Sequence, residues 1–136
     1  MQYQYSVAVR NARLDTVEST IGTAPILEFR SGPPPANCAA APSGTLLSQF
    51  ALPSDWLAAA SGGVKAKAGT WSGSAVGTGN IGHFRIYESG SPSVCHIQGY
   101  VGVTGSPDYD MTVDNVSVAP GQTITVSSFQ ITAGNA

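Results

Sequence analysis

The chain has 136 residues, of which only 10% are charged, and a formal net charge of −2. This length fits one domain, spanning residues 1–136, that can bury roughly two thirds of its unfolded surface. An average soluble domain is roughly 25% charged. Since the six Lys and Arg are scattered singly, the sequence lacks the basic footprint of a nucleic-acid-binding protein, and we expect no nucleic-acid partner.

The sequence also predicts no export, no membrane partner and no zinc. Met1–Tyr5 has neither the basic start nor the apolar run of a secretory signal, and no apolar run reaches the roughly 18 residues of a membrane span. Cys38 and Cys95 are far apart, and neither belongs to a CxxC pair. We interpret them as two unlinked thiols of a protein made in a reducing cytoplasm, with a disulfide as the alternative.

One helix is predicted over residues 7–21. Ser6 is a suitable N-cap, and Gly22 can adopt the left-handed conformation that ends a helix. Helical spacing places the apolar residues Val7, Leu14, Val17 and Ile21 near one face, and leaves Arg10, Arg13, Asp15 and Glu18 mostly in solvent. The apolar face is expected to dock on the chain's own domain, or else on another subunit.

A proline-rich connection separates the first two predicted strands, 26–30 and 45–52. Its prolines, in the run 31–44, fix φ and remove amide donors, so the loop is stiff and extended. We expect it to cover a sheet edge. Docking of its prolines on a signalling module is a minor alternative.

Short strands predominate in the rest of the chain. After a corner or helical turn at 55–60, the alternating strand 64–68 directs Lys65 and Lys67 together toward solvent, and 71–77 is a weaker strand. Strands 82–88 and 94–103 form a hairpin through the loop 89–93, followed by strands at 111–113 and 116–118. In 82–88, Phe84 and Ile86 share one face and His83, Arg85 and Tyr87 the other.

The closing segment 119–133 is a long predicted strand that a Pro-Gly turn opens. Its alternation places Ile124, Val126 and Ser128 on one face, and Thr123, Thr125, Ser127, Phe129 and Ile131 on the other. With about eight short strands between residues 26 and 132, we predict an all-β fold, an antiparallel jelly-roll-like sandwich with one N-terminal α-helix.

No catalytic constellation stands out, and we expect neither an enzyme nor a cofactor. His83, His96 and Glu88 could meet across the hairpin, but a metal site needs a further ligand. The acidic cluster of Asp108, Asp110 and Asp114 could chelate calcium, although stabilising turns is its expected role. Asp108, Asp110 and Glu88 could also act as paired acids of a glycosidase.

Aromatic residues offer a third possibility, a platform for stacking sugars. The candidates are Trp56, Trp71, Tyr87, Tyr100 and Tyr109. Aromatic side chains are at least as common in cores and protein interfaces. A carbohydrate-binding module of the tail-fibre or baseplate type is therefore the alternative to the function considered next.

Three segments carry a resemblance to a known family. Residues 9–17, their continuation 19–22, and the closing run 119–129 resemble the head cement, or decoration, proteins of tailed bacteriophages. The resemblance implies a jelly-roll homodimer on the outer surface of the virion, made in the bacterial host cytoplasm. It would bind the major capsid protein and bridge capsomers, without catalytic residues. We expect the partner interface at Tyr3, Tyr5, Arg10, Arg13, Pro34, Trp56 and Trp71.

Overall fold

A computed structural model describes residues 3–90 and 94–136. Met1, Gln2 and residues 91–93, which belong to the predicted hairpin loop 89–93, lie outside the described residues. The described residues form one helix and nine strands, in chain order α1 Val7–Ile21, β1 Ile26–Ser31, β2 Leu46–Ala51, β3 Val64–Ala66, β4 Ser72–Ser74, β5 Gly79–Tyr87, β6 Cys95–Val103, β7 Met111–Val113, β8 Ser117–Val118 and β9 Thr123–Thr132.

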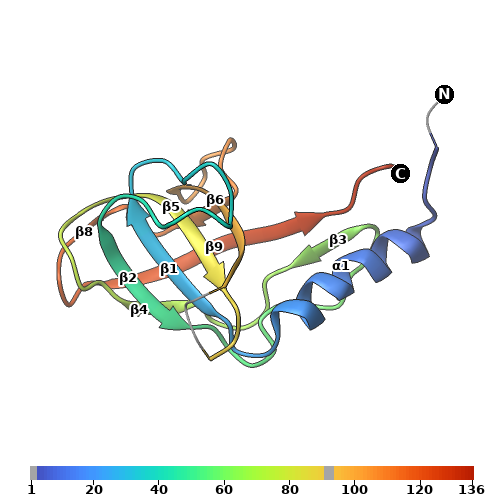
Figure 1. Ribbon diagram of the computed structural model, residues 1–136, viewed down its shortest axis with the longest axis horizontal. Helices are drawn as coiled ribbons and strands as arrows, with labels where there is room; N and C mark the ends of the chain where they lie inside the picture. The colour runs from blue at the N-terminus through green and yellow to red at the C-terminus, as the bar shows by residue number, and fades with distance from the viewer. Residues whose placement is uncertain (1–2, 91–93) are drawn as a thin grey trace.

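The strands form an open, β-sandwich-like fold (Figure 1). Their order is β2-β1-β5-β6-β7-β9-β3, with β4 paired to β9 and β8 paired to β5. An isolated bridge between Ser48 and Ala75 brings β2 back toward β4, so the sheet curls on itself around one core. The all-β prediction with one N-terminal helix is confirmed. The sheet is mixed, however, because β6 and β7 run parallel.

Two tryptophans occupy the centre of the core. The ring centroid of Trp71 lies 5.9 Å from that of Trp56 and 5.5 Å from that of Phe129. Each indole N–H donates to a carbonyl, from Trp56 to Gly22 and from Trp71 to Ala68, both at 3.0 Å. Both side chains are fully buried, so their predicted place on a partner surface does not hold for this fold.

A β-bulge changes the alternation of β9. Thr112 of β7 pairs with Ser128, yet Val113 pairs with Val126, so Ser127 is an extra residue on β9. Phe129 therefore turns to the core side together with Ile124 and Val126. The predicted placement of Phe129 on the opposite face is wrong, because uninterrupted alternation was assumed.

Helix α1 has the predicted bounds. The Ser6 hydroxyl accepts from the amide of Val9 at 3.2 Å, and Gly22, at φ 97°, donates its amide to the Glu18 carbonyl at 2.9 Å. These two contacts satisfy backbone groups that a helix end leaves unpaired.

The helix lies beside the sandwich, with β3 as its main neighbour (Figure 1). The two ends of the chain meet there, since the amide of Tyr5 donates to the carbonyl of Asn135 at 2.7 Å. We call residues 3–21, β3 and residues 131–136 the arm. It forms one end of an elongated molecule.

Candidate functional site

A buried lysine joins the arm's helix to its strand. The Lys65 side chain is only 2% exposed, and its Nζ lies 2.7 Å from Oδ1 of Asp15 and 3.0 Å from Oε1 of Glu18. The prediction that Lys65 points into solvent is wrong, because α1 covers the face of β3 that carries it. The two carboxylates on successive turns of α1 thus have a structural partner.

The shared bonds shift two pKa values in opposite directions. The hydrogen bond from Lys65 lowers the pKa of Asp15 despite some desolvation. Burial alone would lower the pKa of Lys65, but the bonds to Asp15 and Glu18 outweigh it and raise that pKa. The stability from Asp15 is therefore present above its ordinary pKa and lost as the pH falls through the lowered one. That from Lys65 is lost only when the pH rises through its raised pKa.

Arg10 is likewise part of the arm's internal structure. Its Nη2 donates to the carbonyl of Gly62 at 2.8 Å, and its guanidinium occupies the space where residue 63 would carry a Cβ, which Gly63 lacks. Asn11 accepts the amide of Gly63 at 2.9 Å. Arg10 is 8% exposed, so its predicted solvation and its predicted partner contact both fail.

The remaining predicted contact residues divide between two places. Tyr3 and Tyr5 pack edge to face with centroids 5.3 Å apart, and the Arg13 guanidinium lies 5.1 Å from the Tyr5 ring. Tyr3 is 68% exposed. These three side chains form one cluster on the arm, whereas Pro34 lies in the proline loop on the sandwich and is half-buried.

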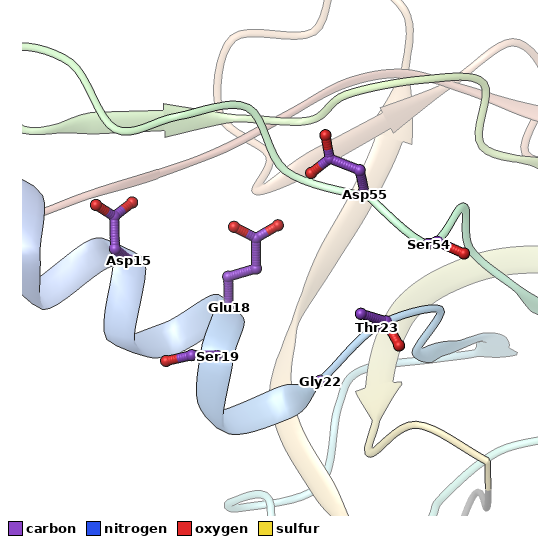
Figure 2. A pocket seen from close by; sticks show the side chains of 7 residues that line it. All are labelled: Asp15, Glu18, Ser19, Gly22, Thr23, Ser54 and Asp55. Atoms are coloured by element: carbon purple, nitrogen blue, oxygen red, sulfur yellow. The ribbon is translucent and has the colours of Figure 1, made fainter.

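A hollow of about 530 Å³ opens between α1 and the segment before Trp56. Figure 2 shows the carboxylates of Asp15 and Glu18 directed from the helix toward the segment that carries Asp55. Lys65 balances only part of this negative charge. The hollow therefore suits a basic side chain of a partner. Within residues 3–90 and 94–136, no three His, Cys, Asp or Glu residues are placed to hold a metal ion.

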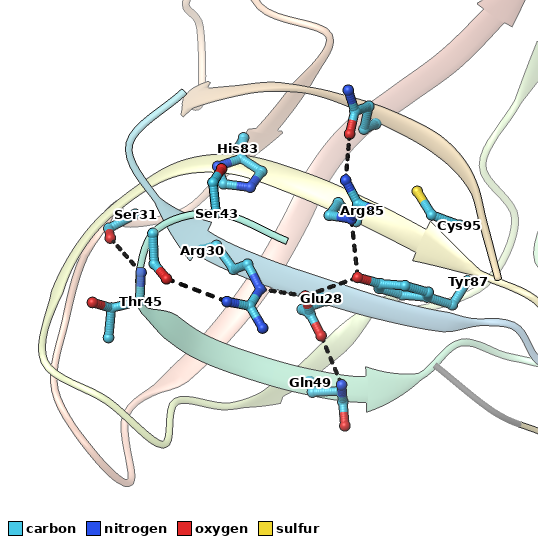
Figure 3. A network of polar contacts seen from close by, with 12 residues as sticks. Glu28, Arg30, Ser31, Ser43, Thr45, Gln49, His83, Arg85, Tyr87 and Cys95 are labelled. Atoms are coloured by element: carbon cyan, nitrogen blue, oxygen red, sulfur yellow. Dashed lines mark hydrogen bonds and ion pairs between the residues drawn. The ribbon is translucent and has the colours of Figure 1, made fainter. Parts of the chain in front are cut away.

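The outer face of the sandwich carries a polar network (Figure 3). Glu28 Oε1 accepts from Arg30 and from the hydroxyl of Tyr87, the latter at 3.2 Å, and its Oε2 accepts from Gln49 at 2.8 Å. Arg85 Nε donates to the same Tyr87 hydroxyl at 2.9 Å. Glu28, Arg85 and Tyr87 are all buried. The charges of Glu28, Arg30 and Arg85 therefore compensate one another within the fold.

The proline loop covers this network by offering its carbonyls. Arg85 Nη2 donates to the carbonyls of Cys38 and Ala40 at 3.0 and 3.1 Å, and Gln98 donates to that of Pro35 at 2.7 Å. Carbonyls are what a proline-rich segment has to offer, because proline has no amide hydrogen. The loop thus covers the face of β5 and β6 and not a sheet edge, which corrects the prediction.

His83 is enclosed beneath the same loop. It is 0% exposed, and its Nδ1 donates to the Gly32 carbonyl at 2.8 Å, which leaves Nε2 as an acceptor with no partner among the described residues. Burial lowers the pKa of His83, and the Arg85 and Arg30 charges lower it further. The ring is therefore neutral at pH 7.

The residues considered for catalysis or calcium make separate contacts. His96 lies 3.4 Å from Glu88, far along the hairpin from His83, which is opposite Tyr100. Asp110 accepts the amide of Tyr100 at 2.9 Å. Asp114 accepts the amides of Asn115 and Thr125, both at 3.0 Å. Asp114 thus holds a backbone turn through Asn115, as the sequence led us to expect, whereas Asp110 binds an amide of strand β6.

The predicted sugar platform does not assemble, since Trp56, Trp71 and Tyr87 are buried. Tyr100 and Tyr109 remain about half exposed. Tyr109 lies against Gly102 and borders a groove of about 420 Å³. Polar groups also line this groove: Lys67, Asp110, Thr112, Ser127, Ser128 and Gln130.

Sequence reasoning missed the internal roles of Arg10, Lys65 and Arg85. The available signal was a single cation inside an otherwise apolar pattern, as in the run 83–87. Comparisons with protein-family models, with curated proteins and with solved structures each found no match. No helix in the described part of the chain is long and apolar enough to cross a membrane.

Proposed function

We propose that this protein is a non-catalytic decoration protein of a tailed-bacteriophage head. It binds the major capsid protein from outside, bridges capsomers and acts as a homodimer, after synthesis in the host cytoplasm. The resemblance of residues 9–17 and 119–129 to head cement proteins supports this proposal. The polar network and the Lys65 ion pairs are compatible with it, because their charges serve the fold.

The exposed arm carries the proposal. Of the eight large hydrophobic side chains exposed in the described residues, three are Tyr3, Val7 and Val9 at the start of the arm. Exposed apolar side chains concentrated in one short segment make that segment a candidate for a protein contact. An arm at one end of an elongated molecule can also reach past the footprint of the sandwich. Repetition over a closed shell would add many modest contacts into a strong attachment.

The arm can be tested with a matched pair of variants. Val7→Ser with Val9→Ser removes its exposed valines, and Val76→Ser with Val103→Ser removes two valines exposed on the sandwich. Serine and valine have similar helix propensities, so α1 should persist. We expect roughly tenfold or greater loss of head binding for the arm variant alone, because burying a valine contributes about 1.5 kcal/mol or more.

Co-sedimentation with purified heads that lack the protein measures this binding, and quantitative mass spectrometry counts the copies per particle. We expect many copies distributed over the head. Equal loss in both double variants would show that the arm is not the contact. A few copies restricted to the tail would overturn the decoration role itself.

A carbohydrate-binding module of the tail-fibre or baseplate type is the second candidate. The half-exposed Tyr109 ring beside a groove with hydroxyl, amide and carboxylate groups favours it, because sugars combine ring stacking with polar contacts. Location at the tail in the same experiment would support this candidate.

A further inference from the structure

The fold brings the two cysteines together on the outer face of the sandwich. Cys95 begins β6 opposite Tyr87 of β5, and Cys38 lies in the proline loop above that face. Both line one hollow of about 470 Å³, together with Arg85 and Tyr87. Both are half-buried with free thiols, so a small reagent can reach them.

The loop is fixed on both sides of Cys38. Arg85 Nη2 binds the carbonyls of Cys38 and Ala40, while Gln98 of β6 binds that of Pro35. The thiol of Cys95 donates to the carbonyl of Ile97 at 3.4 Å. Burial, followed by the neighbouring Cys38 thiol, raises the pKa of Cys95 to about 12. The two thiols are therefore neighbours, and the Arg85 contacts hold the segment around Cys38 in place.

We propose that Cys38 and Cys95 are an oxidisable pair whose intramolecular disulfide clamps the proline loop to β6. The disulfide would add a covalent link to a loop that the hydrogen bonds of Arg85 already hold. It does not depend on the proposed function, because it concerns the isolated chain.

A small disulfide such as oxidised glutathione is a sufficient oxidant. The Cys38 thiolate attacks one glutathione sulfur, which forms a mixed disulfide and releases one glutathione thiolate. The Cys95 thiolate then attacks the Cys38 sulfur, which forms the protein disulfide and releases the second glutathione. Two protein thiols are oxidised, one glutathione disulfide is reduced, and the two thiol protons pass to the released glutathiones. Because the Cys95 thiol stays protonated at neutral pH, the second step limits closure.

Incubation of the reduced protein with oxidised glutathione tests the proposal. We expect the intact mass to fall by about 2 Da, the two hydrogens lost, and a peptide pair linking Cys38 to Cys95. Closure should accelerate by up to about tenfold for each pH unit between 7 and 9, as the thiolate fraction of Cys95 grows. Because the bond closes a loop from residue 38 to residue 95, the midpoint of thermal unfolding should rise by about 10 °C.

Cys38→Ser and Cys95→Ser are the controls. Cys95→Ser should stop at a mixed disulfide on Cys38, whereas Cys38→Ser should react little because burial keeps the Cys95 thiol protonated. Neither variant should gain stability. If the unsubstituted protein also stops at mixed disulfides, or forms only intermolecular dimers, the proposed pair is wrong. Neither result would affect the head-binding experiment, which measures a different surface.

Discussion

His83 illustrates how one buried side chain sets a pH dependence. The neutral ring donates to the Gly32 carbonyl, and its other nitrogen is buried without a partner in residues 3–90 and 94–136. Protonation would add a charge beside Arg85 and Arg30, both of which already lower the pKa of His83. The fold therefore favours the neutral form, and this preference links stability to pH.

We expect the free energy of unfolding to fall as the pH drops below about 6.5, the ordinary pKa of histidine. In that pH range the unfolded chain binds a proton that the folded chain does not. The free energy of unfolding therefore changes by at most about 1.4 kcal/mol per pH unit. His83→Asn keeps an N–H for Gly32 without titrating. Urea unfolding between pH 7.5 and 5.5 should show a smaller slope for this variant, and an unchanged slope would exclude His83 as the cause.

At the scale of elements, two ion pairs join α1 to β3. Lys65 is buried, whereas Asp15 is 58% exposed at its side chain and Glu18 is 26% exposed. The buried Lys65 ammonium consequently depends on the two carboxylates to compensate its charge, whereas the more exposed carboxylates depend less on Lys65. Leaving a buried charge unpaired is costly, while replacing a whole buried ionic set by apolar groups is often neutral.

This asymmetry predicts the order of three variants. Asp15→Asn with Glu18→Gln should lower the free energy of unfolding, because the buried Lys65 ammonium loses both charged partners. Adding Lys65→Met to that pair should recover most of the loss, and urea denaturation measures all three. If the triple variant is less stable than the double, Lys65 is not the source of the cost. Hydrogen exchange in α1 should follow the same order.

The elements themselves were predictable where their signals are local. Ser6 and Gly22 define the ends of α1, and alternation found β5, β6 and β9. The burial of Lys65 was not predictable, because it depends on α1, whose Asp15 and Glu18 lie far away in the chain. Phe129 was misplaced because an extra residue in β9 is visible only against its partner strand. The neighbouring thiols required the docked proline loop, which no local pattern encodes.

At the scale of the whole molecule, half of the positive charge is internal. Three of the six Lys and Arg, namely Arg10, Lys65 and Arg85, are buried. Arg13, on the arm, lies against the Tyr5 ring. The surface that the protein offers to a partner is therefore poor in basic groups and, at the start of the arm, apolar. Association through such a surface should depend on buried apolar area, and little on long-range attraction.

Head binding should accordingly be nearly independent of salt. We expect the dissociation constant to change by less than about threefold between roughly 50 and 500 mM NaCl, because exposed charge interactions are screened over that range whereas apolar burial persists. Co-sedimentation at several salt concentrations measures this dissociation constant. A double variant, Asp15→Asn with Asp55→Asn, removes charge from the acidic hollow and serves as the comparison. A steep loss of binding with salt in the unsubstituted protein, abolished in that variant, would place the contact at the acidic hollow and not at the valines of the arm.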